Sequence, residues 1–139
     1  MPVLKKALTT DRMPDLSQVY SWGMTVQGVQ EWILISGLGS TNPDWTISHP
    51  GNPVGQTRAN FERADAILSD AGASFRDVVR LDITVTEAAR WSEHRDEIRG
   101  IFTEYFHDTD PKPTVGTLKI VSGLADAEML VEIEFLAVR

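Results

Sequence analysis

The stretch Met129-Leu130-Val131-Glu132-Ile133-Glu134-Phe135-Leu136-Ala137-Val138 decides the fold. Its odd-numbered residues are all apolar, as expected for one buried face of a β-strand. The opposite face carries three more apolar side chains and two carboxylates, namely Leu130, Leu136, Val138, Glu132 and Glu134. Because a strand that is apolar on both faces needs cover on both, we expect it to lie inside a sheet with helices on one side and a neighbouring subunit on part of the other.

Strands are also predicted over five other segments, from alternating or β-branched residues. These segments are Val3–Leu8, Val19–Val26, Glu31–Leu38, Asp77–Thr86 and, more weakly, Thr114–Val121. The short link Gln27-Gly28-Val29-Gln30 predicts that the second and third of them form a hairpin, with Gly28 in the turn. In Glu31–Leu38 the residue pairs Trp32/Leu34 and Ile33/Ile35 point to opposite faces, which again favours a homo-oligomer.

Two helices are predicted. The first begins at Asn52-Pro53, where Asn suits the N-cap and Pro the first helical position, and ends at Gly72. The second covers Ala89–Phe106, with one apolar face, and we expect its charged residues to face water. These charged residues are Glu93, Arg95, Glu97 and Arg99. The order of elements predicts an α+β two-layer sandwich in which both helices cover one face of a single sheet.

Length and charge limit the function classes. The 139 residues suggest one domain spanning 1–139. With 13 Lys+Arg against 20 Asp+Glu, the net charge of −7 disfavours nucleic acids and anionic membrane surfaces as partners. The absence of Cys excludes disulfides, thiolate metal sites and a cysteine nucleophile. The longest apolar run, Trp32–Ile35, is far too short to span a membrane, so we expect a soluble, cytoplasmic protein.

Residues alone suggest only two candidate sites. The loop Gly39–Gly51 is long enough to be functional, and it carries Trp45 and His49 as candidate pocket residues. Glu132 either belongs to a solvated strand face or faces an oligomer cleft, where it could take part in acid–base chemistry. No metal-ligand spacing, dinucleotide fingerprint or nucleophile elbow is present in the sequence.

Four segments, in this order, resemble the RidA/YjgF family of reactive intermediate deaminases. They are Tyr20-Ser21 followed by Ile35-Ser36-Gly37, then Gln56-Thr57-Arg58, then Ala71–Arg80, and finally Val131-Glu132-Ile133-Glu134. The resemblance implies a chorismate-mutase-like fold and a homotrimer with ligand clefts between subunits. It also implies hydrolysis of imines and enamines without a cofactor or metal.

The same resemblance assigns roles to individual residues. Tyr20 falls on the family's pocket tyrosine and Glu132 on the carboxylate that positions water, while Ser36 and Gly37 fall on its pocket Ser-Gly pair. The family's carboxylate-binding arginine falls on Gly116, or in another register on Pro113, so the guanidinium is absent.

This difference leaves several functions open. Loss of one charge-assisted hydrogen bond costs about 1.5–3 kcal/mol, which predicts weak activity on small 2-imino acids. Glycine at 116 opens space for a larger ligand, with the backbone of Gly116 and Thr117 as donors, or it merely serves a strand bend. The leading hypothesis is a deaminase of imines or related C–N substrates with altered specificity. The alternatives are a non-catalytic or chaperone-like trimeric binding module and, against the charge, a ribonuclease.

Overall fold

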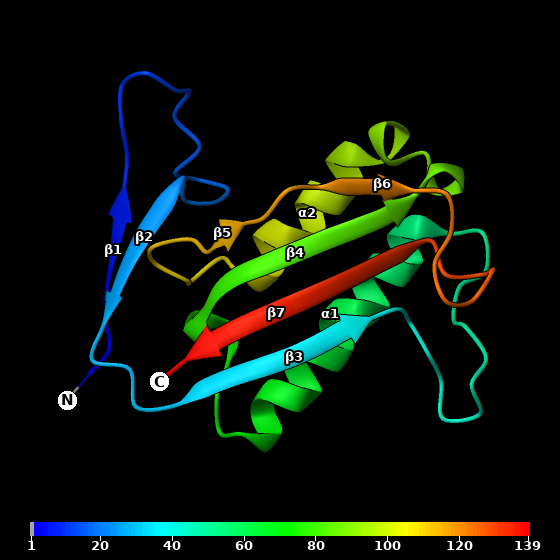
Figure 1. The fold of residues 1–139 in the computed structure, drawn as a ribbon, viewed down its shortest axis with the longest axis horizontal. Helices are drawn as coiled ribbons and strands as arrows, with labels where there is room; N and C mark the ends of the chain where they lie inside the picture. The colour runs from blue at the N-terminus through cyan, green and yellow to red at the C-terminus, as the bar shows by residue number, and fades with distance from the viewer. Residues whose placement is uncertain (1) are drawn as a thin grey trace.

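The computed structural model describes residues 2–139 and places a five-stranded sheet at the centre of the molecule. Its order is β3 (Trp32–Leu38), β7 (Val131–Val138), β4 (Val78–Thr86) and β5 (Thr114–Val115), with β6 (Lys119–Val121) also paired to β4. Both long helices, α1 (Pro53–Asp70) and α2 (Arg95–Tyr105), lie on one face of this sheet (Figure 1). The predicted α+β two-layer architecture is therefore confirmed.

Strand β7 lies in the middle of the sheet, as its sequence predicts. It pairs antiparallel with β3, where Leu34 faces Leu136, and with β4, where Asp82 faces Glu134. Ile133 is fully buried under the helices. The sheet face turned away from the helices, here called the outer face, carries the alternate residues of each strand.

Helix α1 begins as predicted. The Asn52 side chain accepts a hydrogen bond from the Gly55 amide, and Pro53 occupies the first helical turn. The helix buries Phe61, which is completely inaccessible to solvent. Five aromatic rings lie with their centroids within 6 Å of the Phe61 ring, those of Phe75, Phe102, Tyr105, Phe106 and Phe135. This cluster ties both helices to the sheet.

The second helix is shorter than predicted. Two 3-10 turns, η2 (Glu87–Ala89) and η3 (Trp91–Glu93), precede α2. Arg90 lies between them in the left-handed region, at φ 48°, and this conformation interrupts the helical hydrogen bonding. Trp91 therefore lies on a turn beside the helix rather than in it.

The predicted hairpin between Val19–Val26 and Glu31–Leu38 is wrong. β2 (Gly23–Gln27) pairs instead with β1 (Leu4–Leu8), and the two form a separate sheet on the β5 side of the molecule (Figure 1). After β2 the amides of Gln30 and Glu31 both donate to the Arg139 carbonyl, which directs the chain to β7. Residues 19–20 form no strand, since the Val19 and Tyr20 amides donate to the Leu16 carbonyl.

The predicted strand Thr114–Val121 is also divided. Residues 116–118 separate β5 from β6, and both pieces run parallel to β4. Within residues 2–139 no helix combines the length and the apolar composition that crossing a membrane requires.

The outer face exposes less apolar surface than predicted. Leu130 and Val138 are already buried within one chain. Leu130 precedes β7, where strand alternation does not apply, and its amide donates to Gln56 Oε1. The exposed apolar surface of the outer face lies along β3, where Leu34 is 78% and Trp32 58% exposed. Within residues 2–139 β3 pairs only with β7, so this side of the sheet is also a free strand edge.

Candidate functional site

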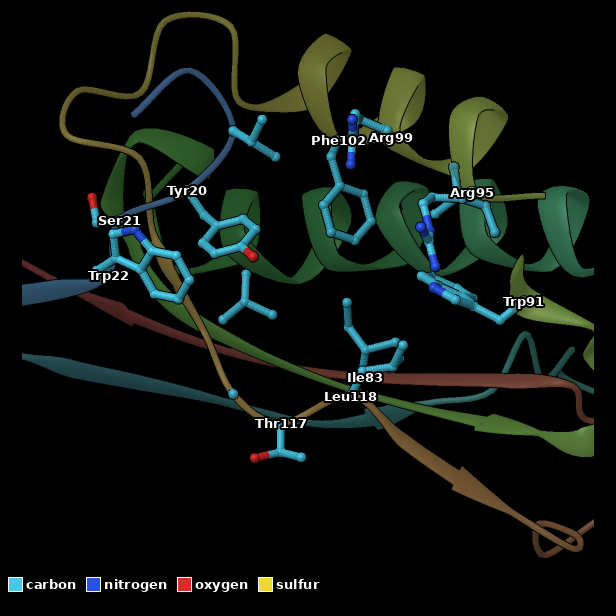
Figure 2. Close-up of a pocket in the computed structure, with 14 residues that line it drawn as sticks. Tyr20, Ser21, Trp22, Ile83, Trp91, Arg95, Arg99, Phe102, Thr117 and Leu118 are labelled. Carbon is cyan, nitrogen blue, oxygen red and sulfur yellow. The ribbon is translucent and has the colours of Figure 1, made fainter. Parts of the chain in front are cut away.

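A cavity of about 410 Å³ lies between α2, the core side of β4 and the segment that precedes β2 (Figure 2). We call it the α2 cavity. Its walls are mostly apolar or aromatic, with two guanidinium groups. The residues that line it are Val19, Tyr20, Ser21, Trp22, Ile83, Trp91, Arg95, Ile98, Arg99, Phe102 and Val115–Leu118. This volume is in the range of small-molecule sites.

Tyr20 lines this cavity, as the family resemblance implied for a pocket residue. Its segment is held against the 112–114 region, where the Ser21 amide donates to the Pro113 carbonyl and Ser21 Oγ donates to the Lys112 carbonyl at 2.6 Å. The Trp22 indole packs edge-on against the Tyr20 ring and donates to the Pro14 carbonyl. These contacts fix the phenol-bearing ring at the cavity, where Figure 2 shows it between Trp22 and Phe102.

The contribution of α2 was missed by the sequence analysis. Arg95 and Arg99 are exposed, as we expected, but they also line the cavity. They share a helix face with Ile98 and Phe102, which are also lining residues. The three- and four-residue spacing that predicted the apolar face could have revealed these arginines at its border.

The backbone of residues 115–118 forms the edge of the cavity, but its donors are partly used. The Gly116 amide donates to the Leu81 carbonyl at 2.9 Å, so it does not point to a ligand. Figure 2 shows the Thr117 side chain directed away from the cavity. Our expectation of free donors therefore does not hold for Gly116.

A side chain at position 116 would displace neighbouring side chains on the outer face. A Cβ on Gly116 would collide with Oδ1 of Asp82 and approach the Arg80 guanidinium, at 2.8 Å from Nη2. Arg80 and Asp82 form an ion pair of 3.2 Å at this point. The Arg80 guanidinium therefore lies beside Gly116, the position to which we assigned the missing arginine. The Asp82 carboxylate already forms an ion pair with this guanidinium.

Glu132 lies on the outer face, next to Gly37. The buried residues Val131 and Ile133 flank it, and across the sheet it faces Thr84. A Cβ on Gly37 would collide with Oε1 of Glu132, so only glycine leaves room for this carboxylate. Ser36 is exposed beside them, just before Gly37. The structure thus brings together the Ser36, Gly37 and Glu132 group that the resemblance assigned to one pocket.

Within one chain this group is separate from the α2 cavity. Ile83, which lines the cavity, points to the helix side, whereas Glu132 points to the outer face. Tyr20 and Glu132 therefore lie on opposite sides of the sheet in a single chain. A reaction centre that uses both side chains requires a second copy.

The loop candidates lie elsewhere. Trp45 is 81% exposed, and His49 is also exposed. Trp45 borders a separate hollow with Arg63. Both loop residues have positive φ, 71° and 52°, and Asp44 Oδ1 accepts from the Thr46 amide. The hydrogen bond that the Thr46 hydroxyl donates to the same carboxylate, followed by that of the Thr46 amide, lowers the pKa of Asp44, as expected for an exposed turn rather than a buried site.

The Gln56-Thr57-Arg58 motif is structural. Buried Gln56 donates to the carbonyls of His49 and Glu128 and accepts from the Leu130 amide. Asn60, one turn later, donates to the Val131 carbonyl at 3.1 Å. These amides join α1 to the start of β7, which positions Glu132.

Across residues 2–139 no three His, Cys, Asp or Glu side chains gather in a way that could hold a metal ion. The titratable side chains at the cavity and on the outer face include the Tyr20 phenol, the Arg95 and Arg99 guanidinium groups and the Glu132 carboxylate.

The two-layer sheet defines a protein of the α+β class, and the α2 cavity has the volume of known small-molecule sites. A sequence profile of the family described as Endoribonuclease L-PSP matches residues 10–139. The chain belongs to this family, that of the RidA/YjgF proteins.

Individual relatives agree with this assignment. A RutC family protein of Aquifex aeolicus is 29% identical over 134 residues, which cover 96% of this chain and 99% of the relative. Among solved structures, the Rid family protein YyfB of Yersinia pestis superposes with a TM-score of 0.82 at 22% identity, covering 97% and 98% of the two chains. TdcF of E. coli, solved with bound serine, gives 0.63 at 26% identity, with 96% and 98% covered.

Proposed function

We propose that this protein is a homotrimeric, cytoplasmic hydrolase of imines, enamines or related C–N substrates, with a larger substrate than the small 2-imino acids. The observation that carries the proposal is the α2 cavity. The Tyr20 phenol and apolar side chains line it, and the cavity is large enough to hold an aromatic side chain. TdcF, a relative of similar length, was solved with serine bound. An amino-acid-like ligand is therefore compatible with this scaffold.

The reaction needs few groups. Water adds to the imine carbon while the nitrogen is protonated, and the resulting carbinolamine releases ammonia to leave a carbonyl compound. A carboxylate can orient the water and accept its proton, and a phenol can hold the nitrogen or return a proton. We assign the first role to Glu132 and the second to Tyr20. Ser36 and Gly37 shape the space around the Glu132 carboxylate.

Because these two side chains lie on opposite sides of the sheet, the proposed site forms between copies. The open β3 edge, with Leu34 and Trp32 exposed, offers a surface of the kind that subunits bury. We therefore propose that a second copy packs against the outer face and brings its α2 cavity to Glu132.

The catalytic proposal is tested with two imines generated in solution. An amino acid oxidase acting on phenylalanine supplies a large 2-imino acid, and a serine dehydratase supplies a small one. Imine decay is followed by trapping with semicarbazide. We expect clear acceleration with the large imine. With the small imine we expect activity about 10- to 150-fold below that of a relative that has the arginine. Equal activity on the small imine would refute the altered specificity.

Two neighbouring carboxylates on β7 provide a matched control. Glu132→Gln should lower turnover of the large imine by about 10²- to 10⁴-fold, because it removes the group that activates water. Glu134→Gln, two residues away on the same face and exposed, should leave turnover nearly unchanged. Equal turnover in both variants would remove Glu132 from the mechanism.

The second candidate function is a non-catalytic binding module. The separation of Tyr20 and Glu132 within one chain favours it if no assembly forms. In that case no imine would decay faster, and Glu132→Gln would leave ligand affinity unchanged. A ribonuclease is disfavoured by the net charge of −7.

A further inference from the structure

We propose that Arg95 and Arg99 form a carboxylate-binding subsite of the α2 cavity and select ligands that combine a carboxylate with an aromatic or branched apolar body. The inference deepens the proposed function, because it names the substrate class for the same cavity. It concerns binding alone, so it can be tested whether or not turnover occurs.

The first argument is geometric. Arg95 and Arg99 are one helical turn apart on α2, so their Cβ atoms are separated by about 5–6 Å. Both side chains line the cavity, and in Figure 2 Arg95 extends from α2 toward the Trp91 indole. Two guanidinium groups at this spacing can bind the two oxygens of one carboxylate.

The second argument is the lack of a partner. Across residues 2–139, neither Arg95 nor Arg99 has a carboxylate oxygen within 4.0 Å. Five other arginines do have such a partner, Arg58, Arg76, Arg80, Arg90 and Arg139. Arg12 and Arg63 also lack such a partner within residues 2–139, but of these four arginines it is Arg95 and Arg99 that line the α2 cavity.

The nearest acidic residues along the helix do not change this. Glu97 lies between the two arginines in sequence, but its carboxylate is directed to His94, at 3.8 Å. Two like charges four residues apart slightly destabilise a helix. A bound anion would offset this repulsion.

The third argument concerns the rest of the ligand. Ile83, Ile98 and Phe102 form an apolar wall beside the arginines, and Trp91 and Tyr20 add aromatic surface. A phenyl or indole ring buried here loses its contact with water, while the charged end stays at the exposed helix border. A small polar acid would leave most of this wall uncovered, which is why we assign a bulky apolar body.

Calorimetric titration with a matched pair of probes tests the assignment. 3-Phenylpropanoate and 3-phenylpropanamide have the same shape and differ in charge. We expect the acid to bind the wild-type protein at least about tenfold more tightly, as for one or two partly exposed charge-assisted hydrogen bonds. The double variant R95Q/R99Q should lose this preference and bind both probes alike.

Arg90→Gln is the control, because it also removes one positive charge near α2 but lies outside the cavity lining. It should keep the preference for the acid. Circular dichroism and thermal unfolding establish that each variant is folded. If R95Q/R99Q does not fold, the single variants Arg95→Gln and Arg99→Gln replace it, and each should reduce the preference.

Three results would overturn the proposal. They are equal binding of acid and amide by the wild type, no binding of either probe at millimolar concentration, and an unchanged preference in the folded arginine variants. Tighter binding of phenyl phosphate than of the carboxylate would overturn the assigned ligand class. Selective binding of the acid by the wild type without turnover of the large imine would refute the proposed enzyme and leave the subsite intact.

Discussion

The two faces of the central sheet differ in how completely one chain covers them. On the helix side, Phe61 and Ile133 are fully buried, and aromatic rings fill the space between layers. On the outer face, Leu34 is 78% exposed, and the same face carries the charged residues Glu132 and Arg80. The helix side is therefore complete in a single chain, whereas the outer face presents surface suited to a second copy.

This difference separates stability from function. Residues that a single chain buries should decide whether the chain folds. Residues of the outer face should decide which assembly forms and whether Glu132 reaches a ligand. Each prediction below tests one side of this comparison.

The largest effect is expected on the helix side. Phe61→Ala should lower the free energy of unfolding by about 3–5 kcal/mol, because it leaves a cavity at the centre of the aromatic cluster. Urea unfolding measures the change. Trp45→Ala removes a larger side chain that is 81% exposed, and it should change stability by no more than about 0.5 kcal/mol. Similar losses in both variants would contradict the assignment of the core.

The second prediction concerns the outer face. Leu34→Lys should shift the assembly to monomers and reduce turnover, because it places a charge in the proposed subunit contact. Light scattering measures the mass, and circular dichroism should show an unchanged fold. Ile67→Lys, at an exposed position of α1 on the helix side, should leave the mass unchanged. A wild-type protein that is already monomeric at micromolar concentration would refute the assembly.

The smallest effect belongs to Tyr105, at the border of the helix-side core. Burial, with the nearby Glu62 carboxylate as a second cause, raises the pKa of Tyr105 above its usual value of 10.0. The neutral phenol is favoured in the folded state, so this contribution is present below pH 10 and is lost as the pH rises through the raised pKa.

Urea unfolding between pH 9 and 11 checks this prediction. The wild type should lose stability more steeply with rising pH than Tyr105→Phe, which has no proton to release. Parallel curves for the two proteins would show that the burial of the phenol is not linked to its ionisation.

Most strands and the helix α1 were predictable because their signals are local. Alternation in Val131–Val138 and the Asn52-Pro53 start each reflect a few adjacent residues. The pairing of β2 was not predictable. A glycine turn between two apolar segments is compatible with a hairpin, but the bonds of Gln30 and Glu31 to the Arg139 carbonyl join residues more than 100 positions apart.

The candidate site was predictable only in part. The resemblance pointed to Tyr20 in a pocket and to Glu132 beside Gly37. It gave no sign of Arg95 and Arg99, because helical periodicity does not show whether a polar residue at the border of a face meets water or a cavity. It also did not show that the Arg80–Asp82 pair occupies the space next to Gly116.

The amino-acid sequence by itself determined the strand and helix segments, the two-sided apolar character of β3 and the family. These follow from periodicity and from residue types at short spacing. Only the tertiary structure decided that β2 pairs with β1 rather than with β3 and that Tyr20 and Glu132 lie on opposite sides of the sheet. Strand pairing, and the side of the sheet on which a segment lies, depend on contacts between residues distant in sequence. Local sequence patterns do not show which of the alternative pairings has the lowest free energy.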